Sequence, residues 1–175
     1  MRRDICIRPA QSTELHFVYQ LVTENEEWTK FNGPYFAYTP PLLDDFATGT
    51  FERLCKGLDM QVITVDDVVV GSVNCYWECE STRWLEAGVV IYDTAYWGQG
   101  IAPVALTQWI SHLFSTREIE RVGMTTWSGN PRMMACASKL GFKQEARLRK
   151  VRFYQGEYYD SVKYGVLRSE WQQHD

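Results

Sequence analysis

A glycine-rich segment at residues 96–103 carries the clearest signal for chemistry in this sequence. It reads Tyr-Trp-Gly-Gln-Gly-Ile-Ala-Pro and joins a run of β-branched residues to a stretch with helical apolar spacing. Such a junction offers backbone N–H groups and the positive end of a helix dipole to phosphate oxygens. Gly98 and Gly100 have no Cβ, so an anion can approach the main chain. Taken alone, the segment fits a phosphate-binding loop and a tight turn without a ligand equally well.

Two common nucleotide-binding motifs do not match this segment. No Gly-Lys-Ser/Thr follows the glycines, as a Walker loop requires, and the third glycine of the dinucleotide fingerprint is missing. A protein that binds ATP phosphates through this loop is therefore disfavoured.

The elements around the loop alternate between strand and helix patterns. We expect strands over residues 5–8, 60–65, 68–77, 83–92, 122–127, 143–154 and 157–167. We expect helices that are capped by Ser12, that run from Pro40 to Cys55, that follow Gly100, and that begin at Asn130. Asn130-Pro131 is typical of a helix start, with Asn at the N-cap and Pro at the first helical position. This order predicts a mixed α/β fold with helices on a central sheet.

Composition limits the class of protein. A chain of 175 residues fits one domain, which we expect over residues 1–175. No stretch approaches the ~20 apolar residues of a membrane span. A net charge of -4 without a basic run argues against nucleic-acid binding. The five cysteines are scattered, and no second Cys/His pair follows Cys75 and Cys79, so we expect no metal site and reduced thiols in a cytoplasmic protein.

Four separated segments resemble the GNAT N-acetyltransferases. Residues 90–102 resemble the acetyl-CoA pyrophosphate loop of that family, in particular the branch with ribosomal-protein N-terminal acetyltransferases, where Trp-Gly-x-Gly-x-Ala/Gly is usual. Residues 85–88 are similar to the strand before the loop, residues 130–142 to the second cofactor-side helix, and residues 147–171 to the closing hairpin. These segments cover most of the chain after residue 60, and their order is more specific than any one of them.

The resemblance implies a fold and a donor site. The fold would be GNAT-like, with a splayed, mostly antiparallel central sheet flanked by about four helices. Acetyl-CoA would lie in the opening between strands 86–92 and 122–127, with its pyrophosphate on the loop amides and its pantetheine arm paired with the main chain. The implied cofactor-binding residues are Val90, Ile91, Tyr92, Trp97, Gly98, Gln99, Gly100, Ile101, Ala102 and Asn130. Asn130 would serve as helix N-cap, as pantetheine contact, or as both.

The implied activity is direct transfer of an acetyl group to a primary amine, without a metal. Glu86 is the candidate general base, acting directly or through water. Its alternative roles are an ion pair with a neighbour such as Arg83 or a place on a solvated strand face. Met133 and Ala137 stand where family members carry hydroxyl groups, which leaves Cys136, Ser138 or water to protonate the thiolate. These missing hydroxyls favour a rival, a non-catalytic acyl-CoA-binding or sensor domain on the same fold.

The acceptor amine belongs either to a protein N-terminus or to a small molecule. Aromatic residues could wall its pocket, and ordinary packing over the sheet is their alternative role. The candidate substrate-binding residues are Trp28, Phe31, Tyr35 and Tyr159. The exposed edge of the last hairpin further suggests a homodimer.

Overall fold

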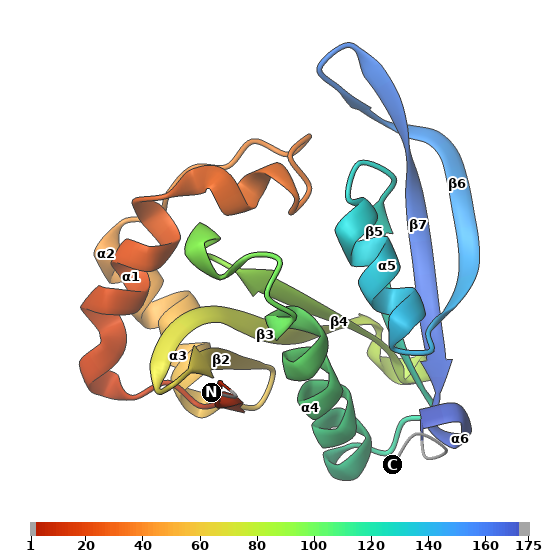
Figure 1. Cartoon of the computed structure of the whole chain (residues 1–175). Coiled ribbons are helices and arrows are strands. Elements are labelled where there is room, and N and C mark those ends of the chain that lie inside the picture. Colours follow the sequence, from red (N-terminus) through yellow and green to blue (C-terminus); the bar gives the residue numbers. More distant parts are fainter. Residues whose placement is uncertain (1–2, 172–175) are drawn as a thin grey trace. The chain divides into compact units, whose positions relative to one another are not determined.

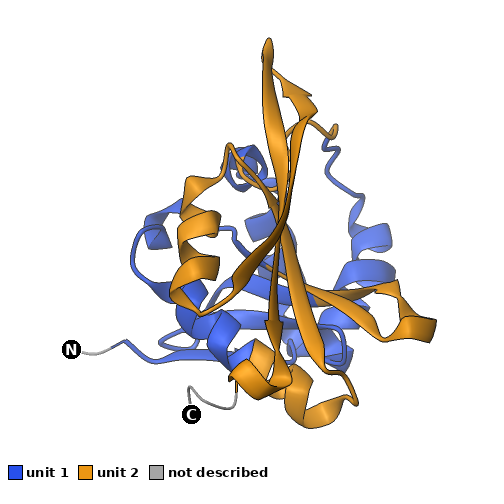
Figure 2. Ribbon diagram, turned by 90° about the vertical axis from the view of Figure 1, so that its right-hand side faces the viewer, with its two compact units in different colours: residues 1–30, 38–74, 89–109 blue, residues 31–37, 75–88, 110–175 orange. Residues whose placement is uncertain are grey.

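The computed structural model describes residues 3–171, and the chain divides into two compact units (Figure 2). Unit 1 contains residues 1–30, 38–74 and 89–109, and unit 2 contains residues 31–37, 75–88 and 110–175. The domain predicted over residues 1–175 thus includes six terminal residues, 1–2 and 172–175, that lie outside the described ones. Among the described residues, no helix has the length and apolar composition needed to cross a bilayer.

Three antiparallel strands form the start of the sheet in unit 1. They are β1 (Ile5–Arg8), β2 (Met60–Val65) and β3 (Val68–Cys79). Asp66 and Asp67 connect β2 to β3 with φ angles of 50° and 67°. Positive φ at both central residues is the geometry of the tight two-residue turn that suits twisted strands. The hairpin predicted at this position is confirmed.

The first helix begins differently from the prediction. A 3-10 turn over Ser12–Glu14 leads into α1 (Leu15–Thr23), so Ser12 is the first helical residue and not the cap. The carboxylate of Glu14 accepts a hydrogen bond of 2.7 Å from the Gln11 N–H and pairs with Arg8 at 2.7 Å. Because Glu14 already satisfies the N–H before the helix, this helix starts without the predicted serine cap.

The second predicted helix consists of three consecutive pieces. These are α2 (Leu43–Phe46), a π-helical turn (Ala47–Phe51) and α3 (Glu52–Lys56). Gly57 ends the last piece with φ 67°, two residues after the predicted end at Cys55. The buried faces of α1, α2 and α3 pack on β2 and β3 through Val18, Val22, Phe46, Phe51, Leu54, Met60, Val62 and Val69.

Unit 2 holds the second part of the sheet. Its strands are β4 (Trp84–Ile91), β5 (Arg121–Trp127), β6 (Lys143–Tyr154) and β7 (Glu157–Leu167). β5 pairs with β7 along its whole length, and β6 and β7 form the long hairpin visible in Figure 1. β4 and β5 are parallel, and their ladder comprises two pairs, Leu85↔Val122 and Glu86↔Gly123. Such a short ladder is what a splayed sheet requires.

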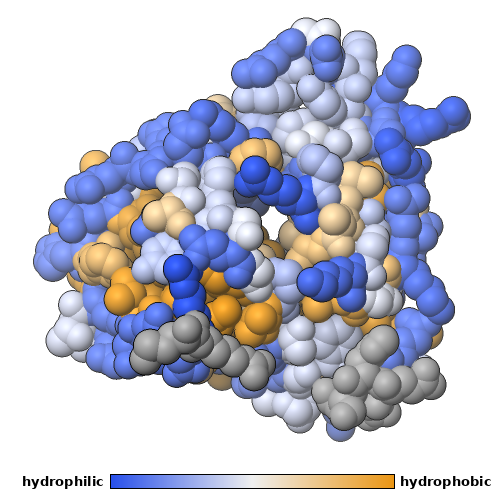
Figure 3. Space-filling model, viewed as in Figure 1, coloured by the Kyte–Doolittle hydropathy of each residue, from blue (hydrophilic) through white to orange (hydrophobic). Residues whose placement is uncertain are grey.

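The strand order confirms the predicted fold class. The order of the seven described strands is β1-β2-β3-β4-β5-β7-β6. Strands β3 and β4 each have residues in both units. The sheet is thus mixed and mostly antiparallel, with α4 (Ile101–Thr116) and α5 (Pro131–Lys139) as its longer later helices. A short helix, α6 (Arg168–Trp171), was not predicted. Strand β6 is an edge of the sheet and exposes both charged residues and the large hydrophobic residues Leu148, Val151 and Phe153. Figure 3 shows hydrophilic and hydrophobic side chains side by side on the face of the molecule that it views.

Candidate active site

The glycine loop of unit 1 lies between β4 and α4, as predicted. Asp93 opens it by accepting a hydrogen bond of 2.9 Å from the Ala95 N–H, which forms a 3-10 turn over Thr94–Tyr96. The indole N–H of Trp97 donates to the Ile91 carbonyl at 2.9 Å and so fixes the loop to the end of β4. Ile101 then begins α4 as a buried anchor. The N–H groups of the first helical turn have no acceptor within the helix and are available to an anion.

Gly98 and Gly100 adopt backbone conformations that favour glycine. Their φ angles are +71° and +75°. A Cβ built on either residue would meet no heavy atom of the described chain within 4 Å. Backbone geometry, and not crowding by the protein, therefore requires the two glycines, and the space in front of them is open. The loop has the two properties that a phosphate needs, exposed main chain and a helix N-terminus.

The residues before the loop are held tightly on β3. The Tyr92 N–H donates to the Val70 carbonyl at 2.9 Å, and the buried Tyr92 hydroxyl bonds Ser72 at 2.7 Å. A Cβ on Gly71 would come within 2.2 Å of the Val90 carbonyl oxygen, so β3 and β4 are in close contact here. Val90 and Ile91 remain half-buried. The candidate pantetheine-binding main chain is thus rigid in unit 1.

Glu86 is a completely buried carboxylate in unit 2, with 0% of its surface exposed. Its Oε1 accepts from the Trp84 indole at 3.1 Å and lies 3.5 Å from Arg121, and its Oε2 accepts from the Thr125 hydroxyl at 2.9 Å. Arg83, the ion-pair partner considered above, instead pairs with Glu118 at 3.5 Å. Three donors satisfy the charge that burial would otherwise make costly.

Two glycines make room for this carboxylate. Gly123 and Gly165 are opposite one another on β5 and β7. A Cβ on Gly123 would lie 2.2 Å from Glu86 Oε1, and a Cβ on Gly165 would lie 2.2 Å from Glu145 Oε1. The sequence analysis missed both residues, because their role depends on strand pairing that a single sequence does not reveal.

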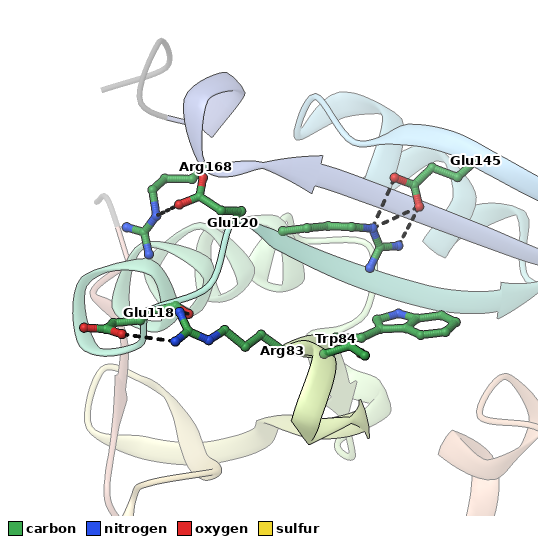
Figure 4. Close-up of a pocket in the computed structure, with 8 residues that line it drawn as sticks. Arg83, Trp84, Glu118, Glu120, Glu145 and Arg168 are labelled. Atoms are coloured by element: carbon green, nitrogen blue, oxygen red, sulfur yellow. Dashed lines mark hydrogen bonds and ion pairs between the residues drawn. The ribbon is translucent and has the colours of Figure 1, made fainter.

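Arg121 connects Glu86 to a charged cavity in unit 2. Its Nε donates to Glu145 at 3.1 Å while its Nη1 faces Glu86. Together with Trp84, Arg121 lines a cavity of about 750 Å³ (Figure 4). Thr82 and charged side chains form its other walls. In Figure 4 the Arg83 side chain points to Glu118 and the Arg168 side chain to Glu120. Of these lining residues, Glu145 binds Arg121 and so holds one partner of Glu86 in place.

Thr125 links the buried carboxylate to the surface. Residues of β5 alternate between faces, so Gly123, Thr125 and Trp127 lie on one face. Thr125 is exposed, yet its hydroxyl donates to Glu86. The period-two alternation of residues 121–127 could have identified it, but its partner on β4 could not be read from the sequence.

Asn130 caps α5, as predicted. Its Oδ1 accepts from the Met133 N–H at 3.1 Å, and its Nδ2 donates to the Phe31 carbonyl at 3.2 Å. The Trp127 indole donates to the same carbonyl at 3.1 Å. Asn130 thus joins the start of α5 to the segment at residues 31–37.

The four candidate acceptor residues fall into two groups. Tyr35 and Tyr159 surround Trp127 in unit 2, with ring centroids 5.7 and 4.9 Å from the indole, and Phe31 contacts it through its carbonyl. Trp28 is buried in unit 1, where its ring packs edge-on against Tyr38 and Tyr92. The aromatic cluster of unit 2, to which Tyr154 also belongs at 6.0 Å, is centred on Trp127, a residue that the sequence analysis did not select.

The thiols of unit 2 differ in acidity. Burial raises the pKa of Cys136 to about 11, so this thiol stays protonated at neutral pH. Hydrogen bonds from the Ser81 and Thr82 side chains lower the pKa of Cys79 to about 7. The Ser138 hydroxyl donates to the Met134 carbonyl at 3.1 Å. Of the two residues named for protonating the thiolate, Cys136 keeps its proton at neutral pH, but its raised pKa makes it a weaker acid than an ordinary thiol.

We expect Cys79 to react with iodoacetamide at a half-maximal rate near pH 7, since the thiolate is the reactive form and a lowered pKa produces it at lower pH. Cys136 should stay unmodified over pH 6–9. Peptide mapping after timed alkylation measures both residues in one sample, and Ser81→Ala should move the Cys79 midpoint upwards. Equal labelling of Cys79 and Cys136 at neutral pH would contradict the assignment.

A glycine loop before a helix, in a mixed and mostly antiparallel sheet with a two-pair parallel ladder, is the arrangement of a GNAT acyltransferase. The chain belongs to this family: the family model described as "Acetyltransferase (GNAT) domain" matches residues 4–143. Among curated relatives, the SPbeta prophage-derived uncharacterized N-acetyltransferase YokL of Bacillus subtilis (strain 168) is 27% identical over 107 residues, which are 61% of this chain and 60% of YokL. The chain spans less than two thirds of the length of the curated relatives it matches.

Solved structures share the fold at low sequence identity. The ribosomal L7/L12 alpha-N-protein acetyltransferase RimL, in complex with coenzyme A, has a TM-score of 0.75 at 19% identity, with 93% of each chain covered. The spermidine N-acetyltransferase of Vibrio cholerae, in complex with CoA and spermine, has a TM-score of 0.75 at 17% identity, with 96% of this chain and 98% of that chain covered. The two neighbours act on different kinds of amine, so the fold leaves the acceptor open.

Proposed function

We propose that this protein is an N-acetyltransferase that transfers the acetyl group of acetyl-CoA to a primary amine. The observation that carries the proposal is the open glycine loop at the start of α4 in a chain of the GNAT family. Backbone N–H groups of residues 98–102 would bind the pyrophosphate, because they combine exposed main chain with the positive end of a helix. Trp97 would hold the loop in shape through its bond to Ile91.

The pantetheine arm and the helix-capping asparagine complete the proposed donor site. The main chain of residues 90–92 would pair with pantetheine amides like an added strand, which the two-pair ladder between β4 and β5 supports. Asn130 would contact the pantetheine arm while it keeps its role as the N-cap of α5, in which both ends of its amide already form hydrogen bonds. The transfer would proceed without a metal.

Glu86 would receive the proton that the amine loses. Because the carboxylate is buried, a direct contact with the amine is blocked, and the Thr125 hydroxyl is the connection to the surface. The ammonium form of the amine would give one proton to the Thr125 oxygen while the Thr125 hydroxyl proton passes to Glu86 Oε2. The neutral nitrogen then attacks the thioester carbonyl and the C–S bond breaks. The CoA thiolate takes up a proton from Cys136 or water, and the second proton that the nitrogen loses replaces it.

We expect Thr125→Val to lower kcat by about 10-fold or more, because it removes the hydroxyl between the amine and Glu86 while keeping the side-chain volume. Thr125→Ser keeps the hydroxyl and should restore most of the rate. Steady-state kinetics of the three proteins measure the effect. Equal kcat values for the valine variant and the wild type would exclude the relay, and so would a serine variant as slow as the valine variant.

The rival function, a non-catalytic acyl-CoA sensor, differs from the transferase in one measurable property, the amine-dependent release of free CoA. Release of free CoA thiol from acetyl-CoA, followed with a thiol reagent, should accelerate when a panel of primary amines is added. Acetyl-CoA binding without amine-dependent release of thiol across the panel would favour the sensor. Amine-dependent release that requires Glu86 supports the transferase.

The setting of the reaction is also part of this proposal. We place it in the cytoplasm, where scattered thiols such as those of this chain stay reduced. A homodimer would form through the β6–β7 hairpin, whose strand β6 is an edge of the sheet.

A further inference from the structure

Arg152 is a cation in the aromatic cluster of unit 2 that has no acidic partner among residues 3–171. Its guanidinium carbon lies 4.9 Å from the ring centroid of Tyr35 and 5.9 Å from that of Phe36. Its Nε is buried and has no hydrogen-bond partner within residues 3–171. The side chain is half-buried, so the outer guanidinium nitrogens stay within reach of a ligand. Stacking fixes the plane of the guanidinium, and its donors are left for an external acceptor.

Nearby carboxylates of the hairpin are engaged with other groups. Glu157 accepts a hydrogen bond from the Tyr159 hydroxyl at 3.2 Å. Asp160 binds Arg147 at 2.6 Å and the Lys150 N–H at 2.9 Å. The Arg152 guanidinium, which has no acidic partner in the described part of the chain, would repel the ammonium groups of a polyamine and attract a carboxylate.

The strand register gives the distance from Arg152 to the proton relay. Arg152 is opposite Tyr159, and Thr125 is opposite Lys163, so four residues of β7 separate them. At the rise of a β-strand this is about 13 Å along β7. Because Thr125 and Arg152 lie on the two strands that flank β7, two strand spacings of roughly 5 Å each add to the separation. The carboxylate of a free amino acid is too close to its own amine to reach Arg152 from Thr125. An extended peptide with an acidic side chain a few residues after its N-terminus has the required length.

We infer that the acceptor is a peptide or protein N-terminus followed within a few residues by Asp or Glu, whose carboxylate binds the Arg152 guanidinium beside Tyr35. This inference rests on the proposed transferase function and narrows its acceptor. A carboxylate can take two parallel hydrogen bonds from the outer nitrogens of a guanidinium. Arg152 is then a residue that sets specificity, and Tyr35 holds it in position.

The test compares five acceptors. Three are hexapeptide amides with a free N-terminus that carry, at the third and fourth positions, glutamate, glutamine or lysine. The other two are free glutamate and spermidine. A charge-assisted hydrogen bond contributes roughly 1.5–3 kcal/mol, so kcat/KM for the glutamate peptide should exceed that for the glutamine peptide by about 10-fold or more. The preference should shrink at high salt. Equal or higher kcat/KM for the glutamine peptide, the lysine peptide, free glutamate or spermidine would overturn the inference.

Variants assign the preference to one side chain. Arg152→Gln should reduce the glutamate-to-glutamine ratio to within about 2-fold, and Arg152→Lys should give an intermediate ratio because it keeps the charge without the planar fork. Arg149→Gln, which removes an exposed charge from the same strand, is the control and should keep the wild-type ratio. A ratio that falls equally in the Arg149 and Arg152 variants would contradict a specific site.

Failure of this inference and failure of the proposed function give different results. Calorimetric binding of the glutamate and glutamine peptides in the presence of CoA reports the same preference without turnover. If no acceptor is acetylated but the glutamate peptide binds more tightly, the transferase function fails and the carboxylate site stands. If spermidine is acetylated best, the function stands and the carboxylate site is rejected.

Discussion

Glu86→Gln should lower kcat by about 100-fold or more, within the range that general-base catalysis contributes. A neutral amide cannot accept the proton that Thr125 passes on. The substitution keeps the side-chain shape, so the amide oxygen can still accept from Trp84 and the amide nitrogen can donate to the Thr125 oxygen. We therefore expect acetyl-CoA affinity and the melting temperature to stay close to those of the wild type.

Glu145→Gln is the matched control for this result. It removes the other carboxylate that binds Arg121 but leaves the Glu86 side chain and its hydrogen bond from Thr125 unchanged. The decrease in kcat caused by Glu145→Gln should be several-fold smaller than the decrease caused by Glu86→Gln. Steady-state kinetics with a saturating acceptor, together with thermal unfolding, separates loss of chemistry from loss of fold. If Glu86→Gln kept the wild-type kcat, Glu86 would not be the base.

Gly100→Glu should reduce acetyl-CoA affinity by about 100-fold or more, because it places a carboxylate where the pyrophosphate is proposed to bind. The chain should still fold. The Cβ at this position meets no atom of the described residues within 4 Å, and a non-glycine residue at positive φ costs roughly 1–2 kcal/mol.

Gly156→Glu provides the control, since Gly156 also has positive φ, at +83°, and open space around its Cβ position, but lies in the β6–β7 turn. Equilibrium dialysis with labelled acetyl-CoA measures both variants. Loss of affinity in both to the same extent would mean that backbone strain, and not the loop, is responsible.

The sequence predicted the parts of the site that depend on local order. The glycine loop follows a strand and precedes a helix, and Asn130-Pro131 starts a helix, because both features are encoded within a few consecutive residues. The fold class followed from the order of these local elements together with the family resemblance. The hydrogen-bond and ion-pair partners of Glu86 could not be predicted from local order, because two of them, Arg121 and Thr125, come from a distant strand.

The missed features all depend on strand pairing or on contacts between distant segments. Arg83, which is near in sequence, was the example given for an alternative role of Glu86 in an ion pair. In the structure the partner is Arg121, which is 35 residues away. The space made by Gly123 and Gly165 requires the β5–β7 register. Trp127 became visible as the centre of the aromatic cluster once residues 31–37 and the hairpin were placed beside it.

The central claim is that this chain binds acetyl-CoA as its co-substrate, and calorimetric titration of acetyl-CoA into the purified protein tests it most directly. We predict saturable binding of one acetyl-CoA per chain, without comparable binding of ATP or NAD in parallel titrations. Failure to bind acetyl-CoA, or equal binding of all three compounds, would contradict the account and leave the glycine loop as a turn without a ligand.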